Sequence, residues 1–280
     1  MNFAVNKEWL VEHLNNQQVK IVDCRFELGN PDKGEKLYQE SHIPGAFYFD
    51  LEKQLSAPVV KHGGRHPLPD TSRFKLEIEK VGIDNTKTVV AYDDGEGQFA
   101  SRFWWLLTYM GHENVYVLNE GFKGWRAADY PTTKDEPKFE SAKFEVNLQN
   151  EMLASYDEVK EIVADKKESP ILIDSRDKAR YLGEIEPIDK VPGHIPGAIH
   201  KFWAESLEQG SFKNKDEQKK RFADLDKKEP IIVYCGSGVT AAPNYIALKM
   251  AGFQNVKLYA GSYSDWVSYD ENPVAKGTKS

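Results

Sequence analysis

The chain has few cysteines, no long apolar run and no excess of basic over acidic charge, and each of these features excludes a class of protein. Its 280 residues include only two cysteines, Cys24 and Cys235, too few for a disulfide framework or a four-cysteine zinc site. No apolar run could span a bilayer, and the first residues lack a secretion signal. The net charge of −7 argues against a nucleic-acid binder. We therefore expect a cytoplasmic protein without nucleic-acid or membrane partners.

What the sequence does contain is a pattern of strands alternating with helices. Residues 88–94 and 114–118 are predicted as strands, and residues 9–18 and 99–110 as helices. Such alternation is typical of an α/β fold with a mostly parallel sheet flanked by helices.

The second half of the chain repeats the first. Asp-x-Arg occurs at 23–25 and at 174–176, and His-Ile-Pro-Gly-Ala occurs at 42–46 and at 194–198. The two offsets, 174 − 23 = 151 and 194 − 42 = 152, are nearly equal, as a tandem duplication would leave them. We expect the aspartate and arginine at 174–176 to form a structural pair at a strand end.

The duplication predicts two domains with different roles. Tyr92-Asp93 in the first copy corresponds to Tyr234-Cys235 in the second. A carboxylate cannot act as a sulfur nucleophile, and its charge would repel a bound anion, so we expect an inactive first domain. Cys24 lies at the position of Ser175 and is interpreted as structural. The expected segments are an N-terminal domain over 1–130, a linker over 131–150 and a catalytic C-terminal domain over 151–280.

Cys235 lies where a buried strand is predicted to meet a helix. Residues 231–234 are predicted as the strand and residues 241–250 as the helix, and Gly236 and Gly238 allow the loop between them to curl. Amides of a tight loop and of a helix N-terminus lack intrahelical partners and stabilise an anion. Cys235 is therefore a candidate nucleophile. The alternative is a buried structural cysteine before an ordinary turn.

Taken together, these motifs resemble those of the two-domain rhodanese-like sulfurtransferases over nearly the whole chain. The most specific of them is Cys-Gly-Ser-Gly-Val-Thr-Ala at 235–241. The resemblance implies tandem rhodanese-like α/β domains and a ping-pong reaction in which Cys235 carries sulfane sulfur as a persulfide. It implies neither a metal nor an organic cofactor. The acceptor would be cyanide or a thiol, such as thioredoxin or a low-molecular-weight thiol.

The residues after the cysteine bear on the sulfur donor. Gly236 and Ser237 are neutral, whereas family members that prefer thiosulfate typically carry basic residues there. The neutral loop is similar to that of the members that use 3-mercaptopyruvate, so the resemblance implies this donor. A thiosulfate sulfurtransferase and a persulfide carrier for a protein partner remain as alternatives.

The resemblance also implies roles for residues outside the cysteine loop. Ser237 would handle protons, and His66 would relay a proton to Ser237 or simply contact the donor. Arg180 would bind the donor carboxylate, with Lys190 as a weaker second cation. Arg65 and Asp70 are further possible contacts that the sequence cannot rank. The alternatives are a helix-capping Ser237, an exposed His66 and a surface Arg180. The loop positions assigned to donor binding are Gly236, Gly238, Val239 and Thr240.

Two rival functions are less compatible with the loop. Related phosphatases use a Cys-x5-Arg loop, but the sixth residue after Cys235 is Ala241, and no arginine lies between them. A catalytically silent binding module would not need the cysteine with its glycine-rich loop. The sequence therefore favours sulfur transfer over both.

Overall fold

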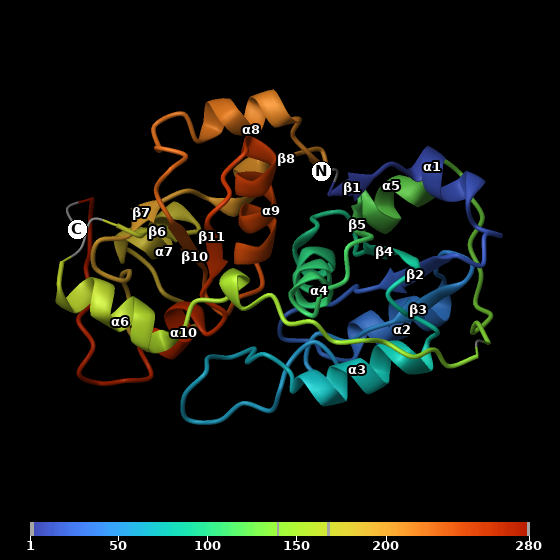
Figure 1. The fold of residues 1–280 in the computed structure, drawn as a ribbon, viewed down its shortest axis with the longest axis horizontal. Helices are drawn as coiled ribbons and strands as arrows, with labels where there is room; N and C mark the ends of the chain where they lie inside the picture. The colour runs from blue at the N-terminus through green and yellow to red at the C-terminus, as the bar shows by residue number, and fades with distance from the viewer. Residues whose placement is uncertain (1–2, 139, 167–168, 279–280) are drawn as a thin grey trace. The chain divides into compact units, whose positions relative to one another are not determined.

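A computed structural model describes residues 3–138, 140–166 and 169–278 and divides into two compact units. Unit 1 contains the chain up to Ala57 together with Pro69–Gln149 and Leu207–Phe212. Unit 2 contains Pro58–Leu68, Asn150–Ser206 and the chain from Lys213 onward. Each unit is an α/β structure with its own sheet (Figure 1).

Unit 1 is built on a five-stranded parallel sheet. Its strand order is β1-β5-β4-β2-β3, and the central strands are rich in valine and buried, as expected for a sheet covered on both faces. The strands are β1 (Ala4–Val5), β2 (Val19–Asp23), β3 (Ala46–Tyr48), β4 (Thr88–Tyr92) and β5 (Val115–Leu118). The helices are α1 (Lys7–Glu12), α2 (Lys33–Glu40), α3 (Thr71–Lys80), α4 (Gln98–Tyr109) and α5 (Gly121–Ala127).

Unit 2 repeats this plan with a four-stranded parallel sheet in the order β11-β10-β6-β7. Its strands are β6 (Ile171–Asp174), β7 (Ile199–His200), β10 (Ile231–Tyr234) and β11 (Val256–Leu258). Its helices are α6 (Tyr156–Ala164), α7 (Lys178–Leu182), α8 (Lys215–Arg221), α9 (Ala241–Ala251) and α10 (Ser262–Trp266), with 3-10 turns at η1 (Asn150–Met152) and η2 (Trp203–Ser206). The predicted fold class, two α/β repeats with mostly parallel sheets, is confirmed.

The repeated sequence motifs form the same contacts in both units. Arg25 Nη2 lies 2.7 Å from Asp23 Oδ2, and Arg176 Nη2 lies 2.6 Å from Asp174 Oδ2, with all four side chains almost completely buried. Burial lowers the pKa of Arg176, but the adjacent Asp174 carboxylate outweighs it and leaves the net pKa raised. The expected structural pair at the strand end is confirmed.

The two His-Ile-Pro-Gly-Ala turns are also held in the same way. The Nδ1 atoms of His42 and His194 lie 2.7 Å from the backbone oxygens of Tyr38 and Tyr181, respectively. Each imidazole stacks on the ring of the same tyrosine, with centroids 3.9 and 4.0 Å apart. Both histidines are buried, so the turns are structural elements of the two units.

Two segments belong to a different unit from their neighbours in the chain. Pro58–Leu68 packs within unit 2, where Gly63 N donates to Asp265 Oδ1 (2.6 Å) and Arg65 N to Ser264 Oγ (3.1 Å). In Figure 1 it is the light-blue loop beside α10. The hairpin β8 (Leu207–Glu208) and β9 (Ser211–Phe212) packs within unit 1. The two compact units therefore do not coincide with the predicted domains, 1–130 and 151–280. Pro58–Leu68 lies in the first predicted domain but packs in unit 2, and the β8–β9 hairpin lies in the second but packs in unit 1.

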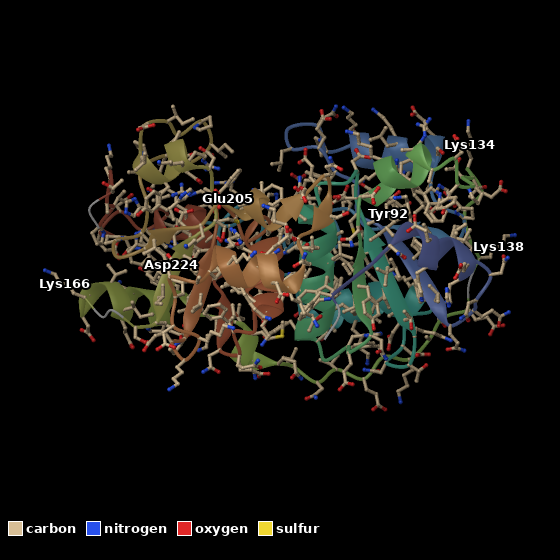
Figure 2. All side chains as sticks on the ribbon, turned by 90° about the horizontal axis from the view of Figure 1, so that it is seen from above. Tyr92, Lys134, Lys138, Lys166, Glu205 and Asp224 are labelled. Atoms are coloured by element: carbon tan, nitrogen blue, oxygen red, sulfur yellow. The ribbon has the colours of Figure 1, made fainter. Side chains whose placement is uncertain are left out.

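Most of the segment predicted as a linker, residues 131–150, belongs to unit 1, which extends to Gln149. Phe144 is fully buried, and its backbone N–H donates to Glu79. Figure 2 shows Tyr92 inside the same unit, whereas Lys134 and Lys138 point outward.

Across the described residues, every helix is too short or too polar to cross a membrane.

Candidate active site

Cys235 directly follows β10 and begins a tight loop that ends at the first residue of α9. Gly238 has φ +76°, and a Cβ there would lie 2.2 Å from the backbone oxygen of Ala260. Only glycine fits this position, since both the space and the dihedral angle exclude a side chain. The N–H of Gly238 consequently points inward and donates to Cys235 Sγ at 3.1 Å. A loop amide therefore faces the thiol of Cys235.

Ser262, at the start of α10, supports the same cysteine. Its Oγ accepts a hydrogen bond from Cys235 N (3.1 Å), donates to Tyr259 O (2.9 Å) and lies 3.9 Å from Cys235 Sγ. Ser262 has φ +57°, a conformation unusual for a residue with a Cβ. No motif named above points to this residue. Trp125 and Trp266 are equivalent in the two repeats, and their offset, 266 − 125 = 141, places Ser262 opposite Gly121, a difference that is its only signal in the sequence.

The structure brings His66 and Ser237 together. His66 Nδ1 lies 2.8 Å from Ser237 Oγ, and both residues are buried. The predicted pairing is present because Pro58–Leu68 packs within unit 2. The capping alternative for Ser237 is wrong, since the N-cap of α9 is Thr240 and the Ser237 hydroxyl faces His66 instead.

The remaining loop positions lie as expected between the cysteine and the helix. Val239 is buried, and Thr240 directly precedes α9. Gly236 differs from Gly238, because the atoms nearest its missing Cβ are guanidinium nitrogens rather than backbone. The cations of this site therefore approach the loop from outside it.

Arg180 is one of these cations. A Cβ on Gly236 would lie 3.5 Å from Arg180 Nη1. Arg180 Nη2 would lie 3.6 Å from the same Cβ, and it is held by two carboxylates, 2.7 Å from Glu186 Oε1 and 2.9 Å from Asp189 Oδ2. Glu186 in turn pairs with Arg176 at 3.1 Å. The surface alternative for Arg180 is wrong, because its side chain is only 12% exposed and lies beside the loop.

Lys190, the other predicted cation, has a different environment. Its ammonium lies 2.6 Å from Asp270 Oδ1, and the side chains are 51% and 94% exposed. It also borders a cavity of about 430 Å³ whose lining includes Val59 and Ile188. The structure does not place Lys190 at Gly236, and a solvated pair of this kind contributes little energy.

The equivalent loop of unit 1 holds a carboxylate in place of the thiol. Asp93 is buried and accepts four backbone hydrogen bonds of 2.9–3.2 Å from residues of its own loop and α4, namely Gly95, Gly97, Phe99 and Ala100. Burial raises the pKa of the Asp93 carboxyl, whereas the four N–H groups act in the opposite direction. The loop amides of unit 1 thus converge as they would on a bound anion, but the Asp93 carboxylate of the protein itself accepts them.

Cys24 lies in a different environment from Cys235. It is 1% exposed and follows β2. Burial, and then the charges of Asp23 and Asp93, raise the pKa of its thiol well above the ordinary value. A buried protonated thiol fits the structural interpretation of Cys24.

Known proteins resemble this chain over most of its length. The model of the rhodanese-like domain family matches residues 6–128 and 155–269. A probable 3-mercaptopyruvate sulfurtransferase of Pseudomonas aeruginosa is 40% identical over 274 residues, covering 96% of each chain. The rat thiosulfate sulfurtransferase is 33% identical over 276 residues, covering 94% of this chain and 91% of the rat protein.

A solved structure agrees with these sequence matches. The crystal structure of the 3-mercaptopyruvate sulfurtransferase SseA from Escherichia coli superposes with a TM-score of 0.81. The two chains are 31% identical, and the match covers 94% of this chain and all of SseA. The chain therefore belongs to the rhodanese-like family, among its two-domain sulfurtransferases.

Proposed function

We propose that this sulfurtransferase takes a sulfur atom from 3-mercaptopyruvate and passes it to a thiol or to cyanide through a persulfide on Cys235. The observation that carries the proposal is the environment of one sulfur atom. Cys235 Sγ accepts the N–H of Gly238, Ser237 of the same loop is 2.8 Å from His66, and Arg180 lies beside Gly236. A nucleophile, a proton-handling pair and a carboxylate-binding cation are thus assembled in unit 2.

In the first half-reaction the Cys235 thiolate attacks the sulfur of the donor. A bond forms between the two sulfurs, the donor carbon–sulfur bond breaks, and its electron pair leaves as the enolate of pyruvate. Protonation of the enolate gives pyruvate and leaves Cys235 as a persulfide. The Gly238 N–H and neighbouring loop amides stabilise the negative charge on sulfur throughout this step.

In the second half-reaction the acceptor removes the outer sulfur. An acceptor thiolate attacks it, the sulfur–sulfur bond to Cys235 breaks, and the bond's electron pair restores the Cys235 thiolate. The product is the acceptor's persulfide, or thiocyanate when cyanide is the acceptor. Thioredoxin and low-molecular-weight thiols are the proposed thiol acceptors.

The His66–Ser237 pair supplies the proton movements. Since His66 Nδ1 and Ser237 Oγ are 2.8 Å apart, one proton can pass between them as the donor's thiol and enolate change charge. We expect Ser237→Ala to lower kcat with 3-mercaptopyruvate by about 10²-fold, the lower end of the usual general acid–base contribution.

The double variant tests whether the two residues act as a unit. Adding His66→Gln to Ser237→Ala should lower kcat little further, because the relay is already broken. Steady-state rates of pyruvate formation measure both effects. Losses that multiply in the double variant would show that the two residues act independently.

Thiosulfate is the second candidate donor, and two observations favour it. The guanidinium groups near Gly236 supply positive charge that the neutral loop lacks, and the rat relative carries the name thiosulfate sulfurtransferase. The deciding measurement is kcat/KM for both donors with the same thiol acceptor. We expect a clear preference for 3-mercaptopyruvate. A preference for thiosulfate would overturn the donor assignment, and activity with neither would favour the carrier alternative.

We also propose that the N-terminal domain is catalytically inactive. Asp93 supports this, since its carboxylate already accepts the loop N–H groups that a sulfur anion would need. We further propose that the protein is located in the cytoplasm. The two free cysteines support this, because disulfides are rare in that compartment.

A further inference from the structure

His66 reaches Ser237 from a segment whose backbone is irregular. The residues of Pro58–Leu68 form bends and extended stretches, so the place of the His66 imidazole is not fixed by a helix or a strand. A proton relay needs heavy atoms within about 2.6–3.2 Å of each other, and the distance of 2.8 Å between His66 Nδ1 and Ser237 Oγ meets this need. Contacts made elsewhere along the segment must therefore hold the imidazole in place.

The first turn of α10 holds the cysteine loop through its backbone. The N–H of Tyr263 donates to Cys235 O at 3.0 Å, and the N–H of Ser264 donates to Gly236 O at 2.9 Å. The Ser262 hydroxyl accepts the N–H of Cys235 as well. These contacts fix the loop that carries the nucleophile to the start of α10.

Side chains of the same turn hold the segment that carries His66. The Asp265 carboxylate accepts the N–H of Gly63 at 2.6 Å, and Ser264 Oγ accepts the N–H of Arg65 at 3.1 Å. Both bonds lie within three residues of His66. One turn of helix thus holds the nucleophile loop with its backbone and the His66 segment with its side chains.

Two neighbouring contacts keep the segment close to the same helix. Gly64 has φ +82°, and a Cβ there would lie 2.4 Å from the backbone oxygen of Gly261, the N-cap of α10. His62 stacks on the ring of Tyr269 with centroids 3.9 Å apart, and its Nδ1 lies 2.7 Å from Ser268 Oγ. The backbone around residue 64 therefore lies directly against the start of α10.

Asp265 is the charged member of this set of contacts. It is only 4% exposed, and its Oδ2 accepts the Tyr259 hydroxyl at 2.6 Å. Burial, and then the negative charge of Asp265, raise the pKa of Tyr259, so this hydroxyl keeps its proton and donates. Hydrogen bonds to an ionised acceptor are roughly twice as strong as those between neutral groups. We therefore expect the bond from Gly63 to Asp265 to be the strongest attachment of the segment.

Building on the proposed function, we propose that Asp265 is a positioning residue for sulfur transfer, which holds Gly63 and thereby places His66 within reach of Ser237. Its carboxylate acts on the proton step through His66 and not on the donor. Because α10 also holds the cysteine loop, the same turn sets the distance between the proton relay and Cys235. Loss of the carboxylate should displace the relay and leave the nucleophile in place.

The test is a steady-state comparison of Asp265→Ala with Tyr259→Phe. Each removes a hydrogen bond of the same buried carboxylate, but only Asp265→Ala releases the N–H of Gly63. We expect Asp265→Ala to lower kcat with 3-mercaptopyruvate by about 10- to 100-fold, since a misplacement of about 1 Å can cost about 100-fold. Tyr259→Phe should lower the unfolding temperature but keep kcat close to the wild-type value. Equal losses of kcat in the two variants would overturn the inference.

The background His66→Gln separates positioning from general support of the fold. If Asp265 acts through His66, adding Asp265→Ala to His66→Gln should lower kcat little further. Losses that multiply would show that Asp265 supports the site in another way, and would overturn the inference. Asp265→Asn should recover part of kcat, because its amide oxygen can still accept the N–H of Gly63.

Gly64→Ala displaces the segment while every side chain of α10 stays in place. The new Cβ would lie 2.4 Å from the Gly261 oxygen and 2.8 Å from Ser264 Oγ, so the segment must move away. We expect a loss of kcat similar to that of Asp265→Ala, again small in His66→Gln. Lys61→Ala, at an exposed position of the same segment, is the control and should keep kcat.

The outcomes separate this inference from the proposed function. If the wild-type protein forms no pyruvate from 3-mercaptopyruvate, the proposed donor is wrong and the inference falls with it. If the wild-type protein forms pyruvate and Asp265→Ala or Gly64→Ala keeps its kcat, the sulfurtransferase proposal stands and only the positioning role is wrong.

Discussion

Replacing Cys235 by serine should abolish sulfur transfer, lowering kcat/KM by at least about 10³-fold with either donor. The hydroxyl is far less acidic than the thiol and forms no persulfide, so both half-reactions lose their nucleophile. The fold should be unaffected, since oxygen is smaller than sulfur and can still accept the N–H of Gly238. Pyruvate release and acceptor persulfide formation measure the activity, and thermal unfolding measures the fold.

Cys24→Ala is the matched control for this variant. Cys24 is the other cysteine of the chain and is equally buried, but it follows β2 in unit 1. We expect this variant to retain most of the sulfur transfer at temperatures where it is folded. Sulfur transfer by Cys235→Ser, or loss of transfer in a folded Cys24→Ala, would show that Cys235 is not the nucleophile.

The largest expected effect on stability comes from Asp23→Ala. The Asp23 carboxylate binds the buried Arg25 guanidinium and accepts the Tyr92 hydroxyl at 2.7 Å. Removing it leaves the Arg25 side chain, which is 3% exposed, without its ion-pair partner; its other contacts include Ser41 O and the Phe122 ring. We expect unit 1 to lose about 3–5 kcal/mol of unfolding free energy, the usual cost of breaking a buried ion pair from one side.

Hydrogen exchange in peptides from β2 and β4 measures this loss locally. Asp270→Ala is the control, because Asp270 forms an ion pair with Lys190 at the surface and is 94% exposed. Its removal should change the unfolding free energy by less than about 0.5 kcal/mol. Equal effects of the two substitutions would contradict the view that the paired motif holds the strand ends together.

The sequence was sufficient to predict the fold because its signals are local and are repeated. The helix predicted over 99–110 is α4 (Gln98–Tyr109), and the strand predicted over 231–234 is β10. The helix predicted over 9–18 was wrong in extent. It begins at Lys7 and ends at Glu12, since the chain then turns through Asn16, whose side chain accepts the N–H of Gln18.

The unit membership of Pro58–Leu68 was beyond the reach of the sequence. The segment follows the first repeat in the chain, but its hydrogen bonds are to Ser264 and Asp265 in unit 2. Contacts between residues about 200 positions apart leave no periodicity or spacing in the sequence. The sequence therefore placed this loop with the first domain.

The candidate site was likewise only partly predictable from the sequence. Cys235 and its glycines could be predicted, because a strand, a glycine turn and a helix are local features. The pairing of His66 with Ser237 came from the family resemblance. Arg65 could not be ranked, and Asp189 was not considered, because the ion pairs that bring them to Gly236 depend on the tertiary structure.

The central claim is that Cys235 carries the transferred sulfur as a persulfide. The most direct test is to mix the protein with 3-mercaptopyruvate in the absence of an acceptor and to analyse its peptides by mass spectrometry. The account predicts that the peptide containing Cys235 gains the mass of one sulfur atom, with an equal amount of pyruvate released, and that added thiol reverses the gain. Pyruvate release without added mass on that peptide, or added mass on the peptide of Cys24 instead, would contradict it.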